Sequence, residues 1–225
     1  GQSMFTRVTL PLLGVAAAAT KVSMDFDAGM SRVSAISGAT GDALEQLEDQ
    51  ALELGAKTEF SAKEAAAGME NLASAGFAVE EIMAAMPGML DLAAAGGVDI
   101  AEASDIASAA LRGFGLAAGQ AGHVADVLAR AAGDTNAGII DMGYAMKYVA
   151  PIASAMGLSI EEVSAAIGLM SNAGIKGEQA GTTLRASLTR LANPTDEAGK
   201  MMRSLGINAF DAEGRMRPLA EIRSE

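Results

Sequence analysis

Helix-start signals recur along this chain, and they restrict its possible folds more than any other feature. The segments Ser61–Glu64, Asp99–Glu102 and Ser159–Glu162 each place a Ser or Asp three residues before a Glu. In such a capping box the first side chain accepts a hydrogen bond from a free amide of the first turn. The later carboxylate accepts a hydrogen bond from the backbone amide of the first residue. Apolar residues recur at helical spacing, whereas the alternation typical of strands is nearly absent. We therefore predict an all-α chain of about nine helices, rich in alanine and glycine and arranged as a helical bundle or an extended helical array.

Glycines predict where the helices end. Gly38, Gly76, Gly174 and Gly206 each follow a run of apolar residues at helical spacing. Glycine is the residue most often found just after a helix, because it adopts the left-handed conformation that closes the last turn. The first long helix is accordingly expected to end at about Ser37, and short glycine-rich turns should join the others.

Prolines predict both helix starts and interruptions. Pro11 fits the first turn of the long first helix, and Asn193–Pro194 predicts an N-cap followed by a proline at the first helical position. Pro87 and Pro151 fall inside helical patterns. Because proline lacks an amide hydrogen and clashes with the preceding turn, each of these two predicts a kink or a break.

The pattern divides the chain into three regions. Residues 1–22 predict an apolar lead-in helix, and residues 23–206 predict a helical core region. In residues 207–225, apolar side chains flank the turn-forming segment Asp211–Gly214. This arrangement predicts a small β-hairpin near 207–219, followed by the start of a truncated continuation.

A faint internal repeat lies within the helical region. Gly76–Ile82 resembles Gly157–Val163 at an offset of 81 residues, and scattered Ala, Met and Leu matches follow. Self-similarity at a fixed period is typical of repeat architectures. We interpret residues 72–112 and 153–191 as a duplicated helical hairpin, although alanine-rich helices also match by chance.

The composition excludes several classes of function. The chain has 16 basic and 28 acidic residues, for a net charge of −12, and no cluster of Lys and Arg that could bind phosphates. We therefore predict no specific nucleic-acid binding. The lack of cysteine excludes disulfides, iron–sulfur clusters and thiol nucleophiles, and it fits assembly in a reducing cytoplasm.

No group of residues predicts catalysis, a metal site or a cofactor. His123 is the only histidine, and zinc would need further His or Cys ligands. The acidic pairs Glu80–Glu81 and Glu161–Glu162 stand in first helical turns. There the helix dipole stabilises negative charge, and the carboxylates can cap free amides. Gly113–Gly115 is not followed by the Lys and Ser or Thr of a phosphate-binding loop. The sequence thus predicts a protein that is not an enzyme.

Five methionines form the sharpest candidate for a contact surface. Met83, Met86 and Met89 recur every three residues on one predicted helix, and Met142 and Met146 are four residues apart. Methionine fills irregular gaps in cores and also adapts to different partners. Core filling is the default interpretation, and an adaptable subunit-contact face is the alternative hypothesis.

Two other functions remain open on the residues alone. Val8–Val22 contains an apolar run of about a dozen residues, shorter than the roughly 20 of a spanning helix. Together with the small-residue helices, it leaves a membrane-active channel or toxin-like component as the main alternative. A fragment of a wall hydrolase is less favoured, because the required His, Cys and carboxylate constellation is missing.

An ordered series of segments carries a resemblance that covers almost the whole chain, from Met24 to Ile222. The longest segment is GYAMKYVAPIASAMGLSIEEVSAAIGLMSNAGIKG, and EQAGTTLRASLTRLANP follows it directly. These segments resemble the core domain of tape measure proteins, found in long-tailed phages and phage-tail-like particles. The segments of the series are Ser23–Thr40, Leu54–Phe77, Ala110–Ile139, Gly143–Gly177, Glu178–Pro194 and Leu205–Ile222.

The resemblance implies a structural role in a virion tail. A tape measure protein occupies the tube lumen as a homo-oligomer, helps to set tail length and to initiate assembly, and is released before DNA ejection. The implied partners are the tail tube protein, baseplate hub and distal tail proteins, tail assembly chaperones and, at ejection, the host membrane. Because a compact domain of 225 residues has a radius of gyration of only about 17 Å, we expect an end-anchoring or initiator-contacting segment rather than the ruler.

Overall fold

The computed structural model describes the backbone of residues 10–211 and 214–222, and side chains from residue 21 onward except Val22. Within these residues it contains ten α-helices and two short 3-10 helices, one α-helix more than the sequence predicts, and no strand. The α-helices are α2 (Leu10–Ser37), α3 (Asp42–Lys57), α4 (Ala62–Ser74), α5 (Val79–Gly96), α6 (Ile100–Phe114), α7 (Ala121–Gly133), α8 (Ile139–Ala155), α9 (Ile160–Asn172), α10 (Gly177–Ala192) and α11 (Asp196–Ser204). The 3-10 helices are η2 (Ala118–Gln120) and η3 (Leu219–Glu221).

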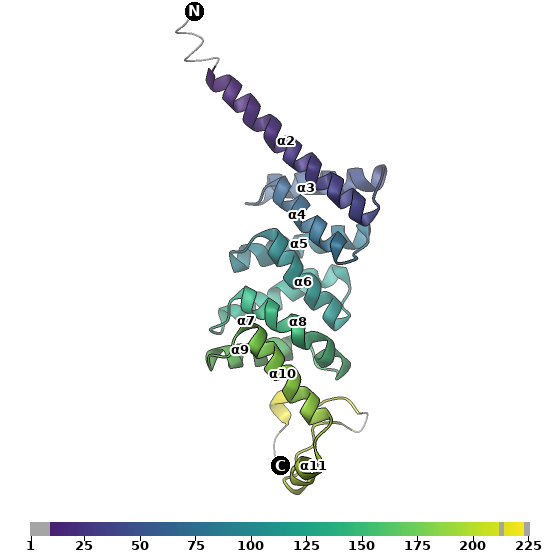
Figure 1. Cartoon of the computed structure of the whole chain (residues 1–225), viewed down its shortest axis with the longest axis vertical. Helices are drawn as coiled ribbons and strands as arrows, with labels where there is room; N and C mark the ends of the chain where they lie inside the picture. Colours follow the sequence, from purple (N-terminus) through teal and green to yellow (C-terminus); the bar gives the residue numbers. More distant parts are fainter. Residues whose placement is uncertain (1–9, 212–213, 223–225) are drawn as a thin grey trace, which may run out of the picture.

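The helices stack in two rows along the long axis of the molecule (Figure 1). The even row consists of α2, α4, α6, α8 and α10, and each packs on the next; the odd row consists of α3, α5, α7 and α9. Successive even helices begin at Ala62, Ile100, Ile139 and Gly177, which are 38, 39 and 38 residues apart. A regular stack of helical hairpins is an α-solenoid. The predicted all-α class is confirmed, as an extended array.

Side-chain contacts link residues about one solenoid unit apart in sequence. The Arg32 Nε donates to the Glu70 carboxylate at 2.8 Å, from α2 to α4. A similar pair joins α7 to α9, and another joins α8 to α6. These exposed ion pairs each contribute little to stability, but their regular spacing follows the repeat of the fold. The pairs are Arg32 with Glu70, Lys63 with Asp25, His123 with Glu161 and Lys147 with Asp105.

Glycines lie where stacked helices approach most closely. A Cβ added at Gly88 of α5 would lie 2.4 Å from the carbonyl carbon of Ala121 in α7. One added at Gly181 of α10 would lie 2.4 Å from the carbonyl oxygen of Ala145 in α8. The missing side chain therefore lets the backbones meet and sets the spacing of the rows. Similarly tight sites at other steps are Gly68, Gly113, Gly143 and Gly168.

The predicted helix-start signals are confirmed at atomic detail. In α4 the Glu64 amide donates to the Ser61 Oγ at 3.3 Å, and the Ser61 amide donates to the Glu64 carboxylate at 2.7 Å. α9 begins with the equivalent box at Ser159, and Asp99 caps α6. The predicted helix ends at glycine are also confirmed. The four glycines that follow these helices all have positive φ: Gly38, Gly76, Gly174 and Gly206.

The predicted cap at Asn193 is wrong, and the breaks allowed for at Pro87 and Pro151 do not occur. Asn193 does not cap the last helix but ends α10, while Thr195 caps α11 by accepting from the Ala198 amide. Pro194 thus lies in the connection, two residues before Asp196, the first residue of α11. Pro87 and Pro151 do not break their helices, since α5 and α8 continue through them.

The predicted β-hairpin near 207–219 is not formed by the described residues. A single antiparallel bridge pairs Phe210 with Met216. The ladder does not extend because the Ile207 amide already donates to the Met202 carbonyl at the end of α11. On the other side, Leu219 begins η3 and leaves the extended conformation. The end of α11 on one side and η3 on the other therefore prevent a longer ladder.

The three-region division stays a prediction. Part of the lead-in region 1–22 lies outside the described residues, and α2 runs without interruption from Leu10 to Ser37. The similar stretches 72–112 and 153–191 contain α5–α6 and α9–α10, which are two solenoid units apart. Their placement explains the spacing of the repeat, while the duplication itself remains a hypothesis.

Candidate interaction surfaces

The five candidate methionines belong to the core of the folded chain. Met86 and Met89 of α5 and Met142 and Met146 of α8 are completely buried, and Met83 is half-buried against the same core. A side chain without exposed surface cannot contact a second subunit in this conformation. Their burial fits core filling, which was the default interpretation, and the subunit-contact face stays a prediction.

The single histidine links two helices of the odd row. The Nε2 of His123 in α7 lies 2.7 Å from the carboxylate of Glu161 in α9, and both side chains are about half exposed. Burial raises the pKa of Glu161, but hydrogen bonds from its own amide, from Ser159 and from His123 outweigh burial. The pKa of Glu161 thus falls below its ordinary value, and His123 takes part in a structural pair.

The other acidic residues singled out in the sequence serve helix starts. The Ala78 amide donates to the Glu81 carboxylate at 2.9 Å, which also lies 3.6 Å from Arg112. The Ser159 amide donates to Glu162 at 3.0 Å. Gly113–Gly115 forms the end of α6, with Gly115 in the left-handed conformation. These residues are therefore accounted for by local structure.

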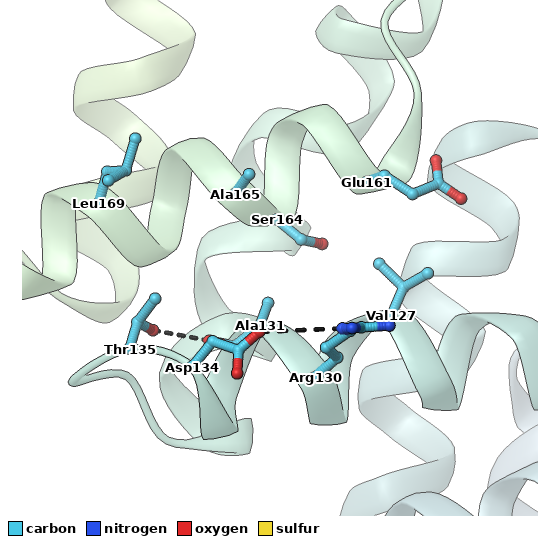
Figure 2. A pocket seen from close by; sticks show the side chains of 9 residues that line it. All are labelled: Val127, Arg130, Ala131, Asp134, Thr135, Glu161, Ser164, Ala165 and Leu169. Carbon is cyan, nitrogen blue, oxygen red and sulfur yellow. Dashed lines mark hydrogen bonds and ion pairs between the residues drawn. The ribbon is translucent and has the colours of Figure 1, made fainter.

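A mostly apolar groove lies between α7 and α9 (Figure 2). Its volume is about 380 Å³, and Leu169 at its edge is 69% exposed. The Ser164 hydroxyl is buried at the groove and has no hydrogen-bond partner among the described residues. α7 and α9 pack less closely than α5 and α7 do. Its lining residues are Val127, Arg130, Ala131, Asp134, Thr135, Glu161, Ser164, Ala165 and Leu169.

A second candidate surface is a stripe of exposed side chains on α8. Ile140, Tyr144 and Tyr148 are four residues apart and are 39%, 42% and 36% exposed. Residues four apart lie on one face of a helix. We call these three side chains the tyrosine ridge. It lies in the even row, between α6 and α10.

The described residues contain neither a metal-binding cluster nor a membrane-spanning helix. Among the described residues, no three His, Cys, Asp or Glu side chains gather where they could hold a metal ion. In the same part of the chain, no helix combines the length and the apolar character needed to cross a membrane.

Comparison with known proteins identifies the family. The model of the family described as "Phage-related minor tail protein" matches residues 48–225. The chain belongs to this family. It is 62% identical over 221 residues to the tape measure protein of Pneumococcus phage Dp-1, across 98% of the chain and 19% of that relative. It is 34% identical over 222 residues to the probable tape measure protein of Escherichia phage P2, across 95% of the chain and 27% of that relative.

The resemblance to tape measure proteins is thereby confirmed. The chain spans 19% and 27% of the length of these two relatives. No solved structure matches the chain.

Sequence reasoning on this phage minor tail family member missed the tyrosine ridge. A usable signal was present, because the only two tyrosines are four residues apart and Ile140 precedes Tyr144 by four. It also missed the link from His123 to Glu161. That link depends on the unit length of about 38 residues, which the faint repeat did not reveal.

Proposed function

We propose that this chain is a structural, non-enzymatic segment of a phage tail tape measure protein. The observation that carries the proposal is the 62% identity to the Dp-1 tape measure protein over nearly the whole chain. The architecture suits such a role, because solenoids present long continuous faces on which other proteins dock.

Within this proposal the complete protein lies in the lumen of the virion tail tube, after assembly in the host cytoplasm. Several copies contact one another, the tube protein, baseplate hub and distal tail proteins, and tail assembly chaperones. The protein leaves the tube before DNA passes and then reaches the host envelope. The net charge of −12 supports this order of events, because an acidic surface repels DNA that follows through the same lumen.

The rise of the solenoid supports different roles for different parts of the complete protein. As a single helix, a unit of 39 residues would span about 58 Å. Stacked helices of one row advance only about 10 Å for the same unit. The folded region is thus about six times shorter per residue than an extended helix. We infer that it anchors one end of the protein and helps to initiate assembly, while helices elsewhere set tail length.

Deletion of one solenoid unit tests this inference. Removal of residues 100–138 joins Asp99, the N-cap of α6, directly to Ile139, the first residue of α8. α8 thereby gains a capping side chain, and the even row loses one step. In the complete gene product, the deletion should change mean tail length by no more than about 10 Å in electron micrographs.

An equally long deletion in a helical region outside residues 1–225 is the matched control. The Dp-1 relative is long enough to contain such a region, since the chain covers only 19% of it. The control should shorten tails by about 58 Å. If removal of residues 100–138 shortened tails by as much, this region would act as the ruler and the proposal would be refuted. Complete loss of tails in that variant alone would support a role in initiation.

A further inference from the structure

We propose that the tyrosine ridge of α8, together with the flanking carboxylates of Glu102 and Glu178, is a docking surface. Its partner is a segment of another protein that carries Arg or Lys among apolar side chains. The proposal deepens the anchoring role and rests on it for its biological setting. The chemistry that selects the partner comes from the surface itself.

The aromatic residues of the chain divide sharply between core and surface. Both tyrosines lie on the ridge and are more than a third exposed. Every phenylalanine among the described residues packs against the core instead. These are Phe26, Phe60, Phe77, Phe114 and Phe210. Exposed tyrosines gathered on one helix face are typical of interfaces, because the ring offers contact area and the hydroxyl a hydrogen bond.

Carboxylates border the ridge on both sides. On the α6 side, Glu102 and Asp105 line a small cleft with Tyr144 and Lys147. Lys147 pairs with Asp105. In the described part of the chain, no hydrogen bond or ion pair engages the Glu102 carboxylate. The α6 side therefore keeps one uncompensated negative charge beside the tyrosines.

On the α10 side, Glu178 lies next to the other tyrosine. Hydrogen bonding to the Glu178 carboxylate, and the charge of that carboxylate, raise the pKa of Tyr148. Gly177 also brings the start of α10 close to the ridge, since a Cβ there would lie 4.0 Å from the Tyr144 Cβ. The ridge is thus an apolar stripe between two acidic margins.

This combination selects a cationic partner. The Nζ of Lys147 already lies 5.4 Å from the centre of the Tyr144 ring, so that ring attracts a cation within the chain itself. An arginine of a partner can stack on a tyrosine ring and pair with a carboxylate at the same time. The net charge of −12 attracts basic partners and disfavours a second copy of the chain.

Binding of a defined probe tests the chemistry. The probe is a short amphipathic helical peptide with Leu on one face and Arg on the other, and its counterpart carries Glu in place of Arg. Fluorescence anisotropy with the purified chain should detect the Arg probe only. The double variant Tyr144→Ala/Tyr148→Ala should weaken binding about tenfold, whereas Tyr144→Phe/Tyr148→Phe should retain it. Equal binding by the alanine variant would overturn the proposal, because charge elsewhere would then explain the affinity.

Variants of the acidic margins separate the ridge from general electrostatics. Glu102→Gln/Glu178→Gln should weaken binding of the Arg probe, and the matched control Glu80→Gln/Asp91→Gln on α5 should not. Both pairs remove two charges from exposed or partly exposed positions. Equal losses in the two variants would refute a local docking surface.

Crosslinking in assembling tails identifies the natural partner. Tyr144 is replaced by p-benzoylphenylalanine in the complete gene product, and Ala84 of α5 is replaced as the control position. Mass spectrometry should map the crosslink at 144, and not at 84, to a peptide of another protein that contains Arg or Lys. Crosslinks to a second copy, to a peptide without basic residues, or at both positions alike would overturn the proposal. If the crosslinking result contradicts the docking surface but the deletion of residues 100–138 leaves tail length nearly unchanged, the anchoring role stands and depends on another surface.

Discussion

Substitution of Gly88 by alanine is the sharpest test of the solenoid packing. The added Cβ would lie 2.4 Å from the Ala121 carbonyl carbon and 2.5 Å from the Gly122 nitrogen, whereas ordinary contacts begin at 3.4 Å. Both obstructing atoms belong to the backbone of α7, so no side-chain rotation relieves the clash. α5 and α7 must therefore separate by about 1 Å at this crossing, and a gap of that size removes a quarter to a half of each dispersion contact.

The magnitude follows from two opposing effects. Overpacking of a closely packed core costs about 3 kcal/mol at the upper end of the usual range, which applies because backbone atoms obstruct. Alanine in place of glycine returns about 1 kcal/mol through helix propensity. Gly88→Ala should therefore lower the free energy of unfolding by about 2 kcal/mol. For a chain of this size, that loss lowers Tm by about 4–8 °C.

Gly122→Ala is the matched control, because it lies in the facing helix and a Cβ there meets nothing within 4 Å. It should leave stability unchanged or raise it by about 0.5 kcal/mol. Urea unfolding followed by circular dichroism at 222 nm measures both variants. A Gly88→Ala protein as stable as the Gly122→Ala protein would refute the argument that glycine sets the distance between stacked helices.

Other predictions test burial and capping. Met86→Ala should lower the free energy of unfolding by about 3 kcal/mol, while Met24→Ala, at a side chain 65% exposed, should change it by less than about 0.5 kcal/mol; chemical denaturation distinguishes the two. Ser61→Ala should cost about 1 kcal/mol through loss of the N-cap, again by urea unfolding. Hydrogen bonds from the Ser61 amide and hydroxyl hold the pKa of Glu64 below its ordinary value of 4.5. This interaction therefore stabilises the fold above that pH and is lost as the pH falls through the lower, folded-state pKa; Ser61→Ala should raise the pKa part of the way, as measured by NMR titration.

Local signals in the sequence predicted most of the individual helices. Ser61, Asp99 and Ser159 cap the helices they were expected to cap, because capping depends on a side chain and an amide only three residues apart. The predicted cap at Asn193 was wrong, because the Ala198 amide donates to the hydroxyl of Thr195, two residues later. Local patterns thus predict that a helix exists more reliably than they predict its first residue.

The arrangement of the helices in two rows could not be predicted in the same way. The repeat visible in the sequence has an offset of 81 residues, which corresponds to two units of the odd row, from Val79 of α5 to Ile160 of α9. Glycines with different roles also look alike in the sequence. Gly97 has positive φ and ends α5, whereas Gly88 lies inside α5 and contacts α7. Nothing near Gly88 in the sequence reveals that contact, because its partner is more than thirty residues away.

The even row offers the more rigid support for docking. Glycine contacts join α4 to α6 at Gly68, α6 to α8 at Gly143 and α8 to α10 at Gly181. The odd row has such contacts at Gly88 and at Gly168, but a groove of about 380 Å³ opens between α7 and α9. In a solenoid each helix depends on its nearest neighbours, so α8 is held closely on both sides. The tyrosine ridge therefore stands on a helix whose position is fixed before a partner arrives, and a preformed surface loses less entropy on binding.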